Sequence, residues 1–272
     1  MGEPRIVVAE AAGVGLDGRD RPTEDRVVLL PNAVVLADGA TALRDDERSG
    51  GWYADHLCTA LAHRLTENPA ADLRSVLAAA IEDLVTEYGL VAGAAPSSTV
   101  AMLRWTPDRV DALVLADSPV IVFTREGVDV LADDRIAGLL PGGYRQRLRT
   151  GAGYGPDHVA AVRTAGRTTD RLRNVPGGFW VAEADPAAAA QARVRSWPRH
   201  DVTAALVASD GVSCGVDDYH LFEWPDVLAM AVDNGPAAVL ARVREAERAD
   251  PDGLRWPRPK RHDDQALVLA RC

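Results

Sequence analysis

Lysine, cysteine and long apolar runs are scarce in this chain of 272 residues. The three cysteines, Cys58, Cys214 and Cys272, are odd in number and form no CxxC pair, so neither a disulfide framework nor a zinc knuckle is indicated. No apolar stretch approaches the roughly 20 residues of a membrane span. The opening MGEPRIVVAEAAG also lacks a basic segment followed by an apolar run, so we expect a cytoplasmic protein.

Positive charge is in the minority as well. The chain has 40 acidic and 30 basic residues, which gives a formal net charge of −10. This excess argues against nucleic acid and anionic membranes as partners, and it suits a protein that attracts cations. Lys260 is the only lysine, so nearly all basic residues are arginines, whose planar guanidinium can bind phosphate through two hydrogen bonds.

Short apolar runs bounded by Gly, Pro or Asn predict strands over residues 5–11, 25–30, 33–38, 98–105, 110–117, 120–125, 128–133, 179–184, 203–211 and 264–272. Helical spacing of apolar residues predicts helices over 49–66, 70–89, 186–194 and 224–249, the last interrupted near Asn234–Pro236. The close succession of strands between 98 and 133 favours antiparallel meanders over strand–helix–strand units. We therefore expect an α+β fold in a single domain over 1–272, with a doubly wound parallel sheet as the weaker alternative. The Gly- and Arg-rich segment 134–175 gives no clear pattern.

One local pattern occurs three times: VVLADGA, LVLADSP and LVASDGV each carry an apolar strand into an aspartate, which is Asp38, Asp117 or Asp210. A single Asp-Gly after a strand is a common turn signal. Three copies can converge at one rim of a sheet, with Asp263 before the closing strand as a fourth acid. Such carboxylates repel one another unless a cation lies among them. Oxygen ligands without histidine or thiolate select Mg²⁺, Mn²⁺ or Ca²⁺, so the pattern predicts a two-metal hydrolytic site.

Six segments, taken in order, resemble the protein phosphatase 2C (PPM) family across most of the chain, as a divergent member of bacterial type. They are TEDR at 23–26, ADGA at 37–40, SSTVAML at 97–103, LADSPVIVF at 115–123, LVASDGV at 206–212 and HDDQALVLA at 262–270. The resemblance implies a four-layer α/β/β/α sandwich around two mainly antiparallel sheets. It also implies hydrolysis of phosphoserine and phosphothreonine in proteins by water that two metal ions activate.

The resemblance further implies roles for individual residues. Asp38, Asp210 and Asp263 would ligate two ions of Mn²⁺ or Mg²⁺, with Asp38 bridging them and acting with the other two in catalysis. The carbonyl of Gly39 would complete one ion, and Glu24 and Asp25 would hold metal-bound waters. Asp117, together with Asp210, matches the place where bacterial members can bind a third ion.

Four departures from the family pattern concern substrate positioning. The run DGATALRDD lacks the usual glycine pair and histidine, Gly-Asp-Ser is replaced by Ala116-Asp117-Ser118, and Asp-Asn is replaced by Asp263-Asp264. The phosphate-binding arginine falls at Asp20, so Arg21, or failing that Arg19, is expected to bind phosphate. Two alternatives therefore stay open: a catalytically silent phosphatase-like binding domain, and a hydrolase of a small phosphorylated molecule.

Overall fold

Two five-stranded sheets form the centre of the protein in this computed structural model, which describes residues 4–41, 48–139 and 142–272. Across the first sheet the strands are β1 (Arg5–Ala11), β10 (Gln265–Arg271), β9 (Val202–Ala208), β6 (Val120–Thr124) and β7 (Val128–Leu131). Across the second they are β2 (Asp25–Leu30), β3 (Ala33–Asp38), β4 (Val100–Trp105), β5 (Arg109–Leu115) and β8 (Arg193–Pro198). All neighbouring strands run antiparallel, which excludes the doubly wound parallel sheet.

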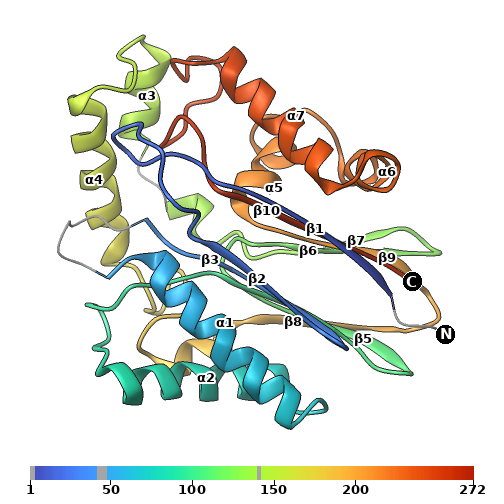
Figure 1. Cartoon of the computed structure of the whole chain (residues 1–272). Coiled ribbons are helices and arrows are strands. Elements are labelled where there is room, and N and C mark those ends of the chain that lie inside the picture. The colour runs from blue at the N-terminus through green and yellow to red at the C-terminus, as the bar shows by residue number, and fades with distance from the viewer. Residues whose placement is uncertain (1–3, 42–47, 140–141) are drawn as a thin grey trace.

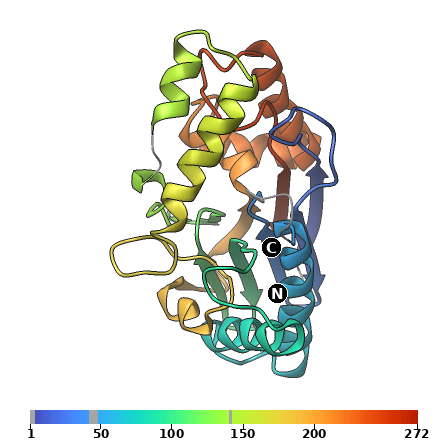
Figure 2. The same ribbon diagram turned by 90° about the vertical axis from the view of Figure 1, so that its left-hand side faces the viewer.

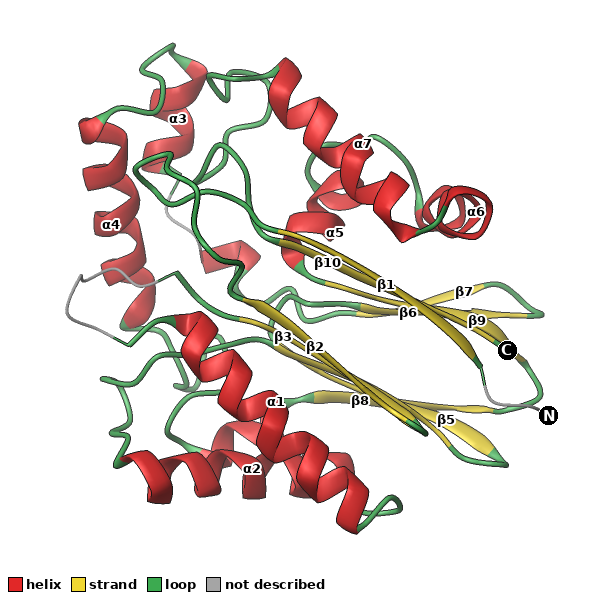
Figure 3. Cartoon of the chain, viewed as in Figure 1, coloured by secondary structure: helices red, strands yellow, loops and turns green. Residues whose placement is uncertain are grey.

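Helices cover the outer face of each sheet, as Figures 1 and 3 show. The second sheet is covered by α1 (Gly50–Glu67) and α2 (Leu73–Tyr88). The first is covered by α5 (Asp210–Asp217), α6 (Trp224–Asn234) and α7 (Pro236–Ala249). The expected four-layer sandwich is thereby confirmed. Two further helices, α3 (Gly143–Arg149) and α4 (Pro156–Asp170), stand across one end of the two sheets (Figure 2).

The core has three apolar layers because both faces of the sheets are covered. In β3, Val34 and Leu36 point into the layer between the sheets, whereas Val35 and Ala37 contact the layer beneath α1 and α2. This alternation is the two-residue period of a strand, and burial on both faces explains why the run AVVLA contains no polar residue. Each fully buried valine or leucine contributes about 1.5–3 kcal/mol to stability.

The first helix has the predicted bounds to within a residue, and the second ends as predicted but begins at Leu73, three residues after the predicted start. Ser49 caps α1 by accepting a hydrogen bond from the Trp52 N–H, and Asp72 caps α2 through Ser75. Gly89 follows α2 with φ +63°, a left-handed conformation that glycine adopts without the steric cost of a side chain. In α2, buried side chains recur every three or four residues, as the predicted amphipathic face requires.

The structure corrects the predictions between residues 134 and 198. FWVAEA, predicted as a strand over 179–184, forms only isolated bridges, through Phe179 and Ala182. The predicted helix over 186–194 is a 3-10 helix at Pro186–Gln191, and the next residues belong to β8. No helix in the described ranges is long and apolar enough to cross a membrane.

Candidate active site

The predicted acids lie at the ends of strands from both sheets. Asp25 begins β2 and Asp38 ends β3, and the two are paired in the register of the second sheet. Asp210 follows β9 as the first residue of α5, and Asp263 comes just before β10, the neighbour of β9. Asp117 lies in the short connection from β5 to β6. All five side chains are therefore carried to one end of the sandwich, the end that α4 crosses.

Two glycines allow the acid-bearing segments to approach one another. A Cβ atom at Gly211 would lie 1.9 Å from the carbonyl oxygen of Asp264, and one at Gly39 would lie 2.3 Å from the carbonyl carbon of Gly50. Neither position has space for a side chain. The Asp-Gly pairs in ADGA and SDGV are therefore required by backbone packing between the segments of the site, beyond any role in a turn.

Hydroxyl groups link these segments. Thr99 Oγ1 accepts a hydrogen bond from the Asp38 N–H at 3.1 Å and lies 2.6 Å from Ser118 Oγ, next to Asp117. Ser98 Oγ donates to the Asp38 carbonyl at 2.9 Å. Thus the SST run positions the carboxylate-bearing end of β3 against the turn that carries Asp117.

That turn contains a strained residue. Ala116 has φ +68°, in the left-handed region, at the position where the family motif has glycine. An L-residue with a Cβ atom pays roughly 1–2 kcal/mol in this conformation. The alanine is tolerated because Ala116 is buried in a small apolar cluster with Phe179 and Val181.

The electrostatics identify a part of the site that lacks positive charge. Burial raises the pKa of Asp38 and Asp210 well above the usual value, and repulsion from neighbouring aspartates adds to the rise in both. Burial likewise raises the pKa of Asp25 to about 7 and that of Asp117 to about 6. Both carboxylate oxygens of Asp25 are buried and accept no hydrogen bond of ordinary geometry from the described residues, although Ser209 and Asp38 lie near enough to oppose part of the rise in pKa. We call Asp25, Asp38, Asp117 and Asp210 the uncompensated acids.

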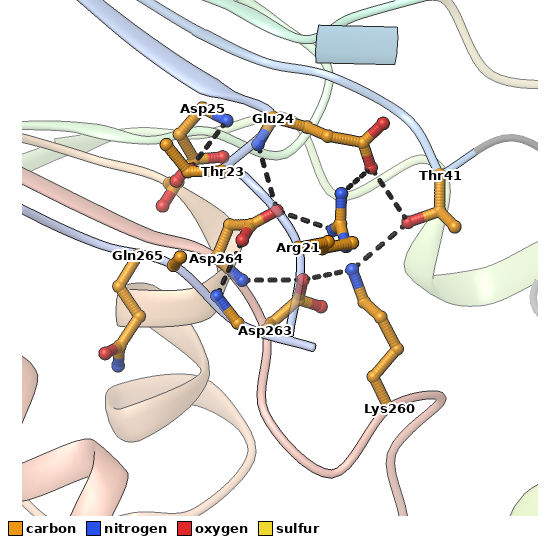
Figure 4. Close-up of polar contacts among 12 residues, drawn as sticks. Arg21, Thr23, Glu24, Asp25, Thr41, Lys260, Asp263, Asp264 and Gln265 are labelled. Carbon is orange, nitrogen blue, oxygen red and sulfur yellow. Dashed lines mark hydrogen bonds and ion pairs between the residues drawn. The ribbon is translucent and has the colours of Figure 1, made fainter. Parts of the chain in front are cut away.

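The other acids of the site have cationic partners (Figure 4). Burial acts to raise the pKa of Asp263, but Lys260, with Nζ 2.5 Å from Asp263 Oδ1, together with the Asp264 N–H and Arg21 outweighs it, and the pKa lies below the usual value. Arg21 forms ion pairs with Glu24 and, at 2.6 Å, with Asp264 Oδ2. We call Glu24, Asp263 and Asp264 the compensated acids.

Asp264 holds three segments together through its carboxylate. Its Oδ1 accepts the Gly13 N–H at 2.7 Å, and its Oδ2 accepts the Glu24 N–H at 3.1 Å in addition to Arg21. An amide at this position could accept through only one of its two terminal atoms. Asp264, at the position where the family has asparagine, therefore forms an ion pair with Arg21. This pair joins the segment just before β2 to the segment just before β10.

The predicted phosphate-binding arginines differ in their surroundings. Arg21 is mostly buried, with 19% of its side chain exposed, and both of its ion pairs are with carboxylates of the site. The side chain of Arg19 is 87% exposed and lies 3.6 Å from Asp17. Only Arg21 is brought to the acids.

A cavity of about 310 Å³ opens onto the cluster. Four of the acids line it, together with Gly39 and Lys260; they are Asp38, Asp117, Asp210 and Asp263. Apolar side chains also line the cavity, among them Val162 of α4, Phe179 and Val181. Sequence reasoning missed Lys260 as a site residue. The available signal was its position three residues before Asp263, as the only lysine of the chain.

The donor set fits a hard divalent cation. All candidate ligands are oxygens, the uncompensated acids repel one another, and Asp25 has two buried oxygens that the described part of the chain leaves without a hydrogen bond. Within the described ranges, however, no three His, Cys, Asp or Glu side chains are gathered closely enough to hold one ion in this arrangement.

Comparison with solved structures identifies the fold. The catalytic domain of the serine/threonine phosphatase PstP, in complex with two manganese ions, aligns with 99% of this chain and 98% of its own, at 17% identity and a TM-score of 0.57. The PPM Ser-Thr phosphatase MsPP from Mycobacterium smegmatis aligns over 100% and 99%, at 15% identity and a TM-score of 0.56. PppA of Pseudomonas aeruginosa aligns over 99% and 98%, at 20% identity and a TM-score of 0.55.

Comparison of the sequence with family models and with curated proteins gives no match. The likeness is therefore one of structure, over the whole chain and at low identity. It bears out the resemblance that the six ordered motifs indicate: the chain has the fold of the bacterial PPM-type serine/threonine phosphatases.

Proposed function

We propose that this protein is a phosphatase that hydrolyses phosphoserine and phosphothreonine in proteins and depends on Mn²⁺ or Mg²⁺. The observation that carries the proposal is the group of uncompensated acids at one end of a PPM-type fold, three of which, Asp38, Asp117 and Asp210, line a cavity. An acidic cluster of this kind costs stability in a protein that binds no cation. The two manganese ions in the PstP structure support the choice of metal.

Asp38, Asp210 and Asp263 are the proposed ligands of two ions, with Asp38 between them and the carbonyl of Gly39 as a further ligand. Asp117 with Asp210 would hold a third, and Glu24 and Asp25 would act through water. Bound divalent cations would neutralise the charge of a phosphate group and favour deprotonation of a water molecule. The chain itself supplies the placement: Thr99 and Ser98 hold the end of β3, and Gly211 lets α5 begin against Asp264.

Phosphate binding by Arg21, with Arg19 as the second choice, stays a proposal. Arg21 is near the acids, and its buried Nε has no hydrogen-bond partner among the described residues. Its terminal nitrogens already contact Glu24 and Asp264. A phosphate group that binds there must therefore share the guanidinium with two carboxylates.

Hydrolysis of an aryl phosphate and of a phosphothreonine peptide tests the proposal. We expect activity with Mn²⁺ or Mg²⁺ and none in EDTA, and we expect Asp38→Asn to abolish it. Asp157→Asn is the matched control, because Asp157 lies on α4 with 91% of its side chain exposed and loses the same charge. Full activity in chelator, or equal activity in the Asp38 and Asp157 variants, would contradict the proposal.

A phosphoprotein-binding domain without catalysis is the second candidate. It is favoured by the two internal cations, Lys260 and Arg21, which already neutralise part of the acidic site. This candidate predicts that the phosphothreonine peptide binds, by isothermal titration, and is released unchanged. Hydrolysis of the aryl phosphate alone would instead favour the third reading, a hydrolase of small phosphorylated molecules.

A further inference from the structure

The only lysine of the chain lies inside the candidate active site. Lys260 lines the cavity beside Asp263 and is only 7% exposed. Its Nζ lies 2.5 Å from Asp263 Oδ1 and donates a hydrogen bond to Thr41 Oγ1 at 3.1 Å (Figure 4). Thr41 follows the Asp38-Gly39 pair, so one ammonium group joins the segment after β3 to the segment before β10.

The loop that carries Lys260 is anchored by Arg258. The guanidinium of this residue, itself 7% exposed, donates to the carbonyls of Glu247, Asp250 and Arg261 at 2.8–2.9 Å and pairs with the Asp250 carboxylate at 3.2 Å. These contacts fix the backbone on both sides of Lys260. The ammonium is therefore held at the acids by the fold and does not reach them as a flexible surface chain would.

A buried ammonium is costly unless it is paired. Here the partner is one of the proposed metal ligands. Asp263 Oδ1 also accepts the Asp264 N–H at 2.9 Å, so this oxygen already has two donors. Asp25, by contrast, has two buried oxygens with no donor from the described residues. Positive charge inside the site is thus concentrated on the Asp263 side.

Resting on the proposed function, we propose that Lys260 is a built-in cation of the site that competes with a divalent ion for the Asp263 carboxylate. An ion bound to Asp263 must displace the ammonium or lie close to its positive charge, and either raises the free energy of the loaded state. An ion among the uncompensated acids meets less of this obstacle, although the charge of Lys260 still lowers the pKa of Asp210 in part. The protein should therefore load one ion readily and a second ion weakly, and Lys260 is the residue that makes the two unequal.

Isothermal titration of the metal-free full chain with Mn²⁺ alone tests this inference. Lys260→Met should tighten the weaker binding step at least tenfold, or add one bound ion where the wild type binds only one. Lys260→Arg keeps the charge and should behave as wild type. Arg5→Met is the matched control, since it also removes one positive charge but alters an exposed residue at the far end of β1 from Asp263.

A second neutral variant, Lys260→Gln, keeps a hydrogen-bond donor and should behave as Lys260→Met; circular dichroism selects whichever of the two is folded. Equal binding in the wild type and the neutral variant overturns the inference, whether or not the protein is a phosphatase. Binding of Mn²⁺ by the neutral variant alone supports the inference and contradicts the metal-dependent function of the wild type. Absence of Mn²⁺ binding in every variant contradicts both.

Discussion

The two groups of acids in the site differ in how their buried negative charge is balanced. The compensated acids, Glu24, Asp263 and Asp264, form ion pairs with Arg21 and Lys260 from within the chain, although burial still raises the pKa of Glu24. Among the described residues no cation forms an ion pair with an uncompensated acid, and burial with mutual repulsion raises their pKa values, although the charge of Lys260 partly offsets the rise at Asp210. The charge of the compensated acids is therefore largely balanced within the chain. The uncompensated acids instead raise the free energy of the folded protein, and a bound cation can remove this cost. This difference marks where the metal should bind first.

Removal of Arg21 should leave two of the compensated acids without their ion-pair partner. Arg21→Met leaves Glu24 and Asp264 buried without their cation, and breaking such a buried pair costs about 3 kcal/mol or more. Urea unfolding in EDTA measures the effect. Arg19→Met should change stability by less than about 0.5 kcal/mol, because Arg19 is largely exposed.

The kinetics of the same variants separate structure from phosphate binding. If Arg21 binds substrate phosphate, Arg21→Met should raise KM for the phosphopeptide at temperatures where the variant is folded. An unchanged KM in both arginine variants would mean that phosphate is bound elsewhere. Equal losses of stability in the two variants would contradict the ion-pair network itself.

A lower pH should stabilise the metal-free protein, because it protonates the uncompensated acids. Asp25 has a pKa of about 7 in the folded protein, against about 3.9 in an unfolded chain. The folded state therefore holds this proton more tightly. The contribution of this protonation to the free energy of unfolding is complete below about pH 4. It is lost as the pH rises to about 7, and over that interval the free energy of unfolding falls by roughly 1.4 kcal/mol per pH unit.

Unfolding of the metal-free protein between pH 5 and pH 7.5 tests this sign. Asp25→Asn cannot ionise, so its stability should fall less over this interval than that of the wild type. Asp157→Asn should retain the wild-type slope because Asp157 is exposed. Parallel profiles for wild type and Asp25→Asn would remove Asp25 from the uncompensated acids.

Backbone strain beside Asp117 should act independently of charge. Ala116→Gly relieves the left-handed conformation but adds entropy to the unfolded chain, so we expect a gain of about 0.5–1 kcal/mol. Urea unfolding should give the same gain with and without Mn²⁺. Ala78→Gly, inside α2, should instead lose about 1 kcal/mol. A loss of stability at position 116 would contradict the strain.

The sequence was sufficient to predict the secondary structure of residues that lie within regular, buried elements. The valine-rich runs that end in Asp38 and Asp210 formed β3 and β9, and the three- and four-residue spacing of 73–88 formed α2. The convergence of the strand ends follows from the antiparallel sheets, and the ordered motifs indicated it in advance.

Predictions were poorest where tertiary contacts, rather than local pattern, determine the structure. β8 is an exposed edge strand with the polar sequence RVRSWP, so it carries no apolar signal. FWVAEA is largely apolar, yet it forms only isolated bridges, and its Phe179 and Val181 pack with Ala116 outside the two sheets. The place of Lys260 depends on the contacts of Arg258 with Glu247 and Asp250, which no local pattern encodes.

The central claim, that the uncompensated acids bind a divalent cation, is tested most directly by four thermal melts. Wild type and Asp38→Asn are each unfolded in EDTA and in Mn²⁺. Because Mn²⁺ binds the folded state, it should stabilise the wild type by about 2.7 kcal/mol at a hundredfold excess over Kd. Asp38→Asn should fold in EDTA, with stability equal to or above that of the wild type, and gain far less from Mn²⁺. Equal Mn²⁺-induced shifts in the two proteins, or an unfolded Asp38→Asn in EDTA, would contradict the account.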